Sequence, residues 1–189
     1  MHAPFPACDI DGDTRPYIFV SYAHKDADAV EYPGVYEILT HLHNQGYRVW
    51  YDQGLPPSKV WAEQLEKAID KAAIFLVFIS PNTIASDNVR DEVVRARNLK
   101  KPIVRVDLQQ TELSRGFGLQ LDAIQALPAW PRSQLDTFYA KLGAALDAAR
   151  AETPPEPVVV HWEQRHRGLL LGLAVLVLLM MAALVLLRH

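Results

Sequence analysis

A short apolar run near the amino terminus ends abruptly in polar residues and limits how this chain can fold. Residues 17–26 read YIFVSYAHKD, in which β-branched and aromatic side chains follow one another without a polar break until position 21. Such runs are typical of a strand that is buried on both faces of a sheet. Pro16 suits the position before a strand, because it cannot donate to the hydrogen-bond ladder. The run therefore predicts a buried strand at about 17–22 that brings polar groups to one edge of a sheet.

Strand and helix patterns alternate along the following 130 residues or so. Further apolar runs at 47–51, 74–79 and 103–106 predict strands, and a less regular region at 119–127 predicts a helix and a short edge strand. Between the strands, apolar residues recur at helical spacing. The positions expected to share buried helix faces are Val35, Leu39 and Leu42; Trp61, Leu65, Ala68, Ile69 and Ala72; Val89, Val93 and Ala96; and Phe138, Leu142 and Leu146. This alternation predicts an α/β fold, with a parallel sheet covered by helices on both faces.

Polar side chains follow the first three predicted strands. Ser21, Tyr22 and His24 come after the first strand, Asp52 ends the second, and Glu92 lies on the helix that starts near the end of the third. In open parallel sheets, ligands bind beyond the carboxyl ends of the strands. We therefore expect these five side chains to surround one cleft.

Glu92 has two interpretations from its position alone. It follows Val89 by three residues and adjoins Val93, so on a helix it lies at the border of the apolar stripe and can point along the edge of the core. The alternative is a solvated carboxylate that pairs with Arg95 or Arg97. The helical spacing is compatible with both, and the two differ in whether Glu92 reaches the cleft.

The carboxyl-terminal part of the chain contains a long uncharged apolar run. Residues 168–187 form a run of 20 without a charged side chain. As a helix this run is about 30 Å long, close to the thickness of the hydrocarbon core of a bilayer. Two arginines precede the run and one follows it, which by the positive-inside rule favours a cytoplasmic amino-terminal domain. We expect a single-pass membrane protein with a carboxyl-terminal anchor.

The segment between the last predicted helix and this run is rich in proline. Three prolines at 154–157 cannot continue a helix and predict a short extended spacer. The expected organisation is a flexible amino-terminal arm at 1–14, a folded domain at 15–150, a proline-rich juxtamembrane linker at 151–167 and a transmembrane helix at 168–187.

Composition excludes several classes of function. The chain has 22 acidic side chains against 19 lysines and arginines and shows no basic stretch of the kind that binds nucleic acid. The seven histidines are scattered without metal-ligand spacing, and no glycine-rich dinucleotide or Walker pattern occurs. The single cysteine, Cys8, fits a reducing compartment. We expect no nucleic-acid partner, no metal and no hydride-transfer chemistry.

Three of the segments above match one known family in order and spacing. The run at 17–26, the stretch GYRVWYD at 46–52 and the stretch AIFLVFISP at 73–81 together resemble TIR (Toll/interleukin-1 receptor) domains of prokaryotic type. The resemblance covers roughly residues 15–150. It implies a flavodoxin-like sheet.

The resemblance also implies an activity. Many TIR domains cleave NAD+ with one glutamate, and alignment of the stretch SPNTIASDNVRDE at 80–92 places Glu92 at that position. Nicotinamide in NAD+ is already a cationic leaving group, so one carboxylate that stabilises the positive charge developing on the ribose is enough. Glycosidases that act on neutral leaving groups need two. The implied protein is a membrane-anchored NAD+ hydrolase, with NAD+ as substrate and no cofactor, that is activated by assembly as a bacterial antiphage effector. The residues expected to bind the substrate are Ser21, Tyr22, His24 and Asp52.

The family often assembles through the loop that follows the second strand, here 53–59. The expected partners are therefore other TIR domains, the lipid bilayer and NAD+.

Two departures from the family pattern bear on activity and assembly. Asn88 replaces an aromatic residue, usually tryptophan, four positions before the glutamate, and the loop carries Pro56 and Pro57 where a glycine is common. A non-catalytic adaptor that mediates homotypic TIR interactions at the membrane remains an alternative, and so does a tail that disrupts the membrane when it oligomerises.

Overall fold

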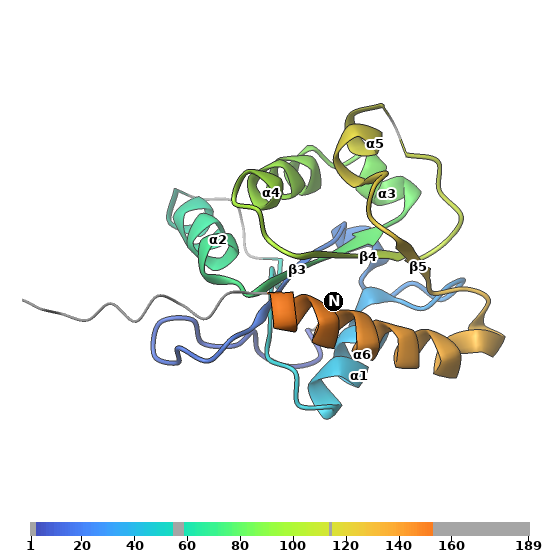
Figure 1. Cartoon of the computed structure of the whole chain (residues 1–189), viewed down its shortest axis with the longest axis horizontal. Helices are drawn as coiled ribbons and strands as arrows, with labels where there is room; N and C mark the ends of the chain where they lie inside the picture. The colour runs from blue at the N-terminus through green and yellow to red at the C-terminus, as the bar shows by residue number, and fades with distance from the viewer. Residues whose placement is uncertain (1–2, 55–58, 114, 153–189) are drawn as a thin grey trace, which may run out of the picture. The chain divides into compact units, whose positions relative to one another are not determined.

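Five parallel strands form the centre of the fold (Figure 1). The computed structural model describes residues 3–54, 59–113 and 115–152. The strands lie in the order β2-β1-β3-β4-β5, and each neighbouring pair is parallel. Their bounds are Ile18–Ser21 for β1, Val49–Tyr51 for β2, Ile74–Ile79 for β3, Ile103–Asp107 for β4 and Ala126–Pro128 for β5. This order confirms the expected flavodoxin-like sheet.

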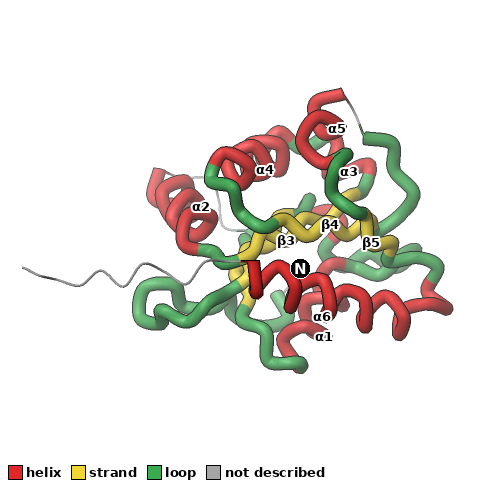
Figure 2. The backbone as a smooth tube through the Cα atoms, viewed as in Figure 1, coloured by secondary structure: helices red, strands yellow, loops and turns green. Residues whose placement is uncertain are grey.

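Helices cover both faces of the sheet (Figure 2). On one face α1 and α6 pack against the strands, and on the other α2, α4 and α5 do so. The bounds are Val35–Asn44 for α1, Lys59–Lys71 for α2, Pro81–Ile84 for α3, Asp87–Asn98 for α4, Arg115–Leu121 for α5 and Leu135–Glu152 for α6, with 3-10 turns at His24–Asp26 (η1) and Arg132–Gln134 (η2). A parallel sheet needs this two-sided cover, because both faces of its central strands are apolar.

The central strand β3 is buried along its whole length, so its side chains pack alternately into the two layers of core. On the α2 and α4 side, Phe75 stacks on Phe19 of β1 with ring centroids 5.3 Å apart, and Phe19 stacks on Trp50 of β2 at 5.2 Å. These three rings occupy matching positions on three adjacent strands. Cross-strand aromatic pairs of this kind help to fix the register of a sheet.

The predicted strands and helices are confirmed, with two local differences. The second strand begins at Val49 rather than at 47, because Gly46 takes a left-handed φ of 86° after α1 and the Tyr47 amide donates to Leu42. A glycine adopts that conformation at little cost, and Gly46 follows the end of α1. The helix predicted within 119–127 lies earlier in the chain, as α5 at Arg115–Leu121, where Phe117 and Leu121 are buried and Leu119 is 84% exposed.

Residues 3–14 do not form the expected flexible arm but lie against the outer edge of β2. The amide of Cys8 donates to the carbonyl of Val49. The ring of Phe5 stacks on His43 at 4.2 Å, and its carbonyl accepts from the hydroxyl of Tyr51. Covering an edge strand in this way satisfies backbone groups that would otherwise remain open to pairing with another chain.

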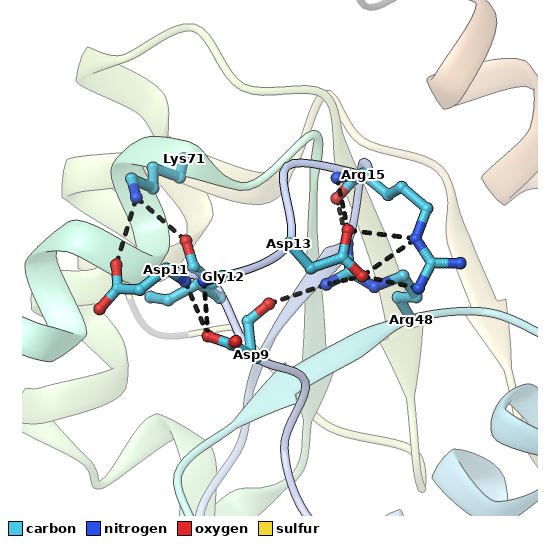
Figure 3. Close-up of polar contacts among 8 residues, drawn as sticks. Asp9, Asp11, Gly12, Asp13, Arg15, Arg48 and Lys71 are labelled. Atoms are coloured by element: carbon cyan, nitrogen blue, oxygen red, sulfur yellow. Dashed lines mark hydrogen bonds and ion pairs between the residues drawn. The ribbon is translucent and has the colours of Figure 1, made fainter.

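Arg48 attaches this amino-terminal segment to the sheet (Figure 3). Its guanidinium donates to the carbonyl of Asp9 at 2.8 Å and to the carbonyl of Arg15, and it lies 3.2 Å from the carboxylate of Asp13. Lys71 of α2 donates to the carbonyl of Ile10 at 3.0 Å. The arginine side chain is 16% exposed, so these contacts are shielded from water in part.

The predicted linker and membrane span fall at 153–189, outside the described residues, except that positions 151 and 152 continue α6. Among the residues that the structure describes, no helix is long and apolar enough to cross a membrane.

Arg48→Ala should lower the free energy of unfolding by about 1–2 kcal/mol, because it removes a largely buried side chain together with its hydrogen bonds to two carbonyls. Arg15→Ala is the matched control. Arg15 pairs with the same carboxylate of Asp13 but its side chain is 74% exposed, so its removal should leave the stability unchanged within error. Denaturant titrations of the two variants provide the measurement, and equal effects would show that the amino-terminal segment is not held by Arg48.

Candidate functional site

A cleft of about 320 Å³ opens at the carboxyl ends of β1 and β3. Its walls come from the segment after β1, the end of β2, the start of α2 and the amino-terminal halves of α3 and α4. The chain leaves β1 toward α1 on one face of the sheet and leaves β3 toward α4 on the other face. The crevice at this switch point is where open α/β sheets bind their ligands.

Glu92 of α4 reaches the base of this cleft. One carboxylate oxygen accepts a hydrogen bond from the hydroxyl of Ser21 at 2.5 Å. Ser21 is the last residue of β1 and is 1% exposed, so it lies beneath the glutamate. The alternative pairing with Arg95 does not occur: Arg95 instead forms two hydrogen bonds to Asp70 of α2, at 2.9 and 2.8 Å. The structure therefore favours the cleft-facing interpretation of Glu92.

The surroundings of the Glu92 carboxyl group change its acidity. The residue keeps an opening to the cleft, but its carboxyl group is packed among protein atoms, and this burial raises its pKa to about 7. The hydrogen bond from Ser21 acts in the opposite direction, and the negative charge of Asp52 raises the pKa further. A carboxyl group that titrates near neutrality on the wall of a cleft is a common feature of functional sites.

His24 and Asp52 form a pair at the rim of the cleft. The Nε2 of His24 lies 3.1 Å from a carboxylate oxygen of Asp52, and this hydrogen bond raises the pKa of His24. Burial acts to raise the pKa of Asp52, but the hydrogen bond and charge of His24 help to hold it below its ordinary value. The hydroxyl of Tyr22 donates to the backbone carbonyl of Asp52 at 2.6 Å. These contacts join the segment after β1 to the end of β2.

A third acidic residue, Asp26, lies behind the cleft wall and was not predicted from the sequence. Asp26 is fully buried and accepts hydrogen bonds from the hydroxyl of Ser80 at 2.5 Å, the hydroxyl of Tyr32 at 2.6 Å and the amide nitrogen of Asn82 at 2.6 Å. Ser80 also caps α3, because its hydroxyl accepts from the amide of Thr83. The network joins η1 to the start of α3.

The structure brings the five predicted side chains together, in two layers. Tyr22, His24, Asp52 and Glu92 line the cleft, whereas Ser21 lies beneath Glu92 and orients it. Sequence reasoning did not identify the other residues that complete the walls, among them Lys25, Trp61, Asn82 and Ser86. Trp61 and Leu65 were expected in the core, and both line the cleft half-buried. Within the described residues no group of three or more histidine, cysteine or acidic side chains could hold a metal ion.

The raised pKa of Glu92 predicts how stability changes with pH. It is about 7 in the folded chain against an ordinary value of 4.5. Between these values the folded chain binds more protons than the unfolded one, so the stability contributed by Glu92 is full below pH 4.5 and is lost as the pH rises through 7. Glu92→Gln should therefore gain stability relative to the parent as the pH rises from 5 to 8. Melting temperatures of both proteins over this range test it, and a constant difference would contradict the assigned burial.

Comparisons with known proteins agree with this fold. The family model described as the TIR domain matches residues 18–142. The TIR domain of the Toll-related receptor TRR-2 from Hydra magnipapillata superimposes with a TM-score of 0.56 at 17% identity, over 69% of this chain and 97% of that one. The TIR domains of the activated Roq1 resistosome, which directly recognises the pathogen effector XopQ, give a TM-score of 0.43 at 15% identity, over 74% of this chain and 86% of that one.

A comparison with curated protein sequences gives no match. At its level of identity, the likeness to the Hydra receptor domain concerns the fold alone. The family model, by contrast, covers well over half of the chain and includes every predicted site residue. The chain belongs to the TIR domain family.

Proposed function

We propose that this TIR domain hydrolyses the bond between nicotinamide and ribose in NAD+, with Glu92 as the catalytic carboxylate. The observation that supports this most directly is the placement of Glu92 at the base of the cleft, with Ser21 holding one of its oxygens at 2.5 Å. A carboxylate that is fixed before the reaction needs no reorganisation as charge develops beside it, which is the main requirement for electrostatic catalysis.

The reaction needs little more than this group. As the bond to nicotinamide breaks, the ring takes the bonding electrons and leaves as a neutral molecule, while positive charge develops on the ribose. The carboxylate of Glu92 stabilises that charge, and water then adds to the ribose carbon and releases a proton to the solvent. Apolar side chains of the cleft wall, such as Phe19, Leu65 and Val89, limit the contact of the carboxylate with water on the protein side and strengthen its field.

The remaining predicted residues have separate roles in this proposal. Ser21 acts through Glu92, as a positioning residue. Tyr22 and Asp52 hold the two segments of the rim together, and the exposed imidazole of His24, kept in place by Asp52, contacts the substrate. The protein uses no cofactor, and NAD+ is its substrate.

Glu92→Gln should reduce the rate of NAD+ cleavage by about 10²-fold or more, the scale for the loss of one preorganised electrostatic group. The amide keeps the shape of the side chain and can still accept from Ser21. Asp91→Asn is the matched control, because Asp91 is the preceding residue of α4 and is exposed; its rate should stay close to that of the parent. Nicotinamide release measures both, and a parental rate for Glu92→Gln would exclude Glu92 as the catalytic group.

Asn88 supports a second candidate, a non-catalytic adaptor that recruits other TIR proteins. Asn88 is exposed and lines both the cleft and a neighbouring groove between α2 and α4. A tryptophan at this position would cover more of the wall beside Glu92, so the cleft is more open to water than in family members that carry the aromatic residue. An adaptor would assemble without cleaving NAD+ at any protein density.

The second part of the proposal concerns the membrane and assembly. A single helix at 168–187 anchors the protein with its TIR domain in the cytoplasm, and domains confined to the bilayer assemble through the loop at 53–59, which directly follows the cleft residue Asp52 in the sequence. A neighbouring domain packed there excludes solvent from Glu92, which a lone domain cannot do. Confinement to two dimensions raises the effective concentration of partners. In this form the protein is a bacterial antiphage effector that consumes NAD+ when it is clustered.

Full-length protein on vesicles should show a specific activity that rises steeply over about a hundredfold range of surface density. A chain that ends at Glu152, and so keeps α6 whole, should stay near its basal rate at the same bulk concentrations. Pro57→Glu should abolish the rise, whereas Pro157→Glu, the same change in the linker, should keep it. A flat response of the parent excludes control by assembly, and release from vesicles by high salt without detergent excludes the membrane span.

A further inference from the structure

The buried carboxyl group of Asp26 determines the orientation of a neutral side chain in the cleft. Asp26 is 0% exposed, and in the described part of the chain no ion pair involves it. It is held only by donors, namely the hydroxyls of Ser80 and Tyr32 and the amide of Asn82. A buried carboxyl group without a cation depends on such hydrogen bonds, so each of these partners is constrained.

Asn82 is the one partner of Asp26 that also lines the cleft. A carboxylate oxygen accepts hydrogen bonds, so the amide nitrogen of Asn82 must face Asp26, at 2.6 Å, and its amide oxygen must face away. The side chain is only partly exposed, and no described residue donates to that oxygen. The cleft wall therefore presents an oriented hydrogen-bond acceptor that is available to a ligand.

The other groups in the cleft limit what that ligand is. Glu92 accepts from Ser21 and Asp52 is paired with His24, so the deeper polar groups are acceptors or are already satisfied. The rest of the wall is mainly apolar or aromatic, with Trp61 among its members, and its polar residues are Ser86, Asn88 and the exposed Lys25. A volume of about 320 Å³ lies at the small end of the range for ligand pockets and suits one half of a dinucleotide rather than a whole one. The cleft thus favours a flat, positively charged group that carries an N–H donor.

We infer that Asn82 is a specificity-determining residue whose amide oxygen accepts a hydrogen bond from the carboxamide of the nicotinamide ring, and that Asp26 is the positioning residue that holds it in this orientation. The inference rests on the proposed function, in which the ring is one bond away from the ribose beside Glu92. It extends that function by naming what the site distinguishes: a dinucleotide with a carboxamide on its ring from one with a carboxylate.

The expected preference for NAD+ has two physical causes. The acid analogue lacks the donor that Asn82 accepts from, and its negative charge is repelled. In nicotinic acid adenine dinucleotide the donor is replaced by an anionic oxygen. That oxygen would face the amide oxygen of Asn82, with Asp26 directly behind it. Sites built to hydrogen-bond a ligand group reject analogues that lack it, because the polar group of the protein is then left unpaired. The parental site should therefore bind NAD+ tenfold or more tightly than the acid analogue, a modest factor on this scale because the cleft is open to water.

The test measures binding rather than turnover. Full-length protein in the Glu92→Gln background, which does not consume the ligand, is titrated calorimetrically with NAD+ and with nicotinic acid adenine dinucleotide. Asn82→Ala should reduce the preference for NAD+ to less than about threefold. Asp26→Asn should reduce it as well, because an amide at position 26 can also donate and no longer fixes the orientation of Asn82.

Tyr32→Phe is the matched control. It removes another of the hydrogen bonds to Asp26, but Tyr32 does not line the cleft. This variant should be less stable than the parent but keep the parental preference for NAD+ over the acid analogue. If the network were purely structural, the preference would instead follow the loss of stability. The inference is overturned if the Glu92→Gln protein binds both dinucleotides equally, if it binds neither, or if Asn82→Ala keeps the full preference. The first two outcomes need no folded variant at position 82. The proposed function is judged separately, by nicotinamide release from the protein with Glu92 intact.

Discussion

The pairing of β1 with both β2 and β3 is the constraint on which the rest of this structure depends. Because β1 lies between these two strands, its carboxyl end opens where the chain moves to opposite faces of the sheet. The register places Ser21 opposite Val77 of β3, so the first polar residue after the apolar run lies under α4. Glu92 can then reach the sheet edge without leaving the helix stripe that Val89 and Val93 bury. The cleft follows from topology, and its chemistry from one serine and one glutamate.

A buried acid at this position has a cost that the surrounding fold has to offset. Burial disfavours the ionised form of Glu92, and only the hydroxyl of Ser21 and the more distant charge of His24 act against it. The fully buried strand β3 and the stacked rings of Phe75, Phe19 and Trp50 stabilise the fold. Their favourable free energy offsets the unfavourable burial of Glu92. Functional sites often contain an unfavourable feature of this kind, here a buried acid, while the rest of the chain is locally favourable.

Much of this fold follows from local patterns in the sequence. Six apolar residues in succession predict β3 at its observed bounds, and Gly46 predicts the end of α1. The features that were not predicted depend on contacts between distant parts of the chain. Asp26 meets its partner Asn82 across 56 positions, and the amino-terminal segment is held by Arg48, which is 39 positions from Asp9. Hydrogen bonds between residues this far apart leave no periodic pattern in the sequence. An aspartate in a buried network therefore cannot be distinguished from an exposed loop aspartate by its sequence position.

Glu92 and Asp26 differ in a way that explains the separate roles proposed for them. Glu92 has one protein donor and remains open to the cleft, so part of its hydrogen-bonding capacity is available to a ligand. Asp26 has three donors and no exposure, so it cannot contact a ligand and acts only through the side chains that it orients. Only one of those side chains, Asn82, lines the cleft. A buried carboxyl group that is fully satisfied is rigid, and rigidity is what the orientation of a neutral amide requires. In the function that we propose, the charge at Glu92 and the orientation at Asn82 are complementary means of recognising a cationic ring with an amide substituent.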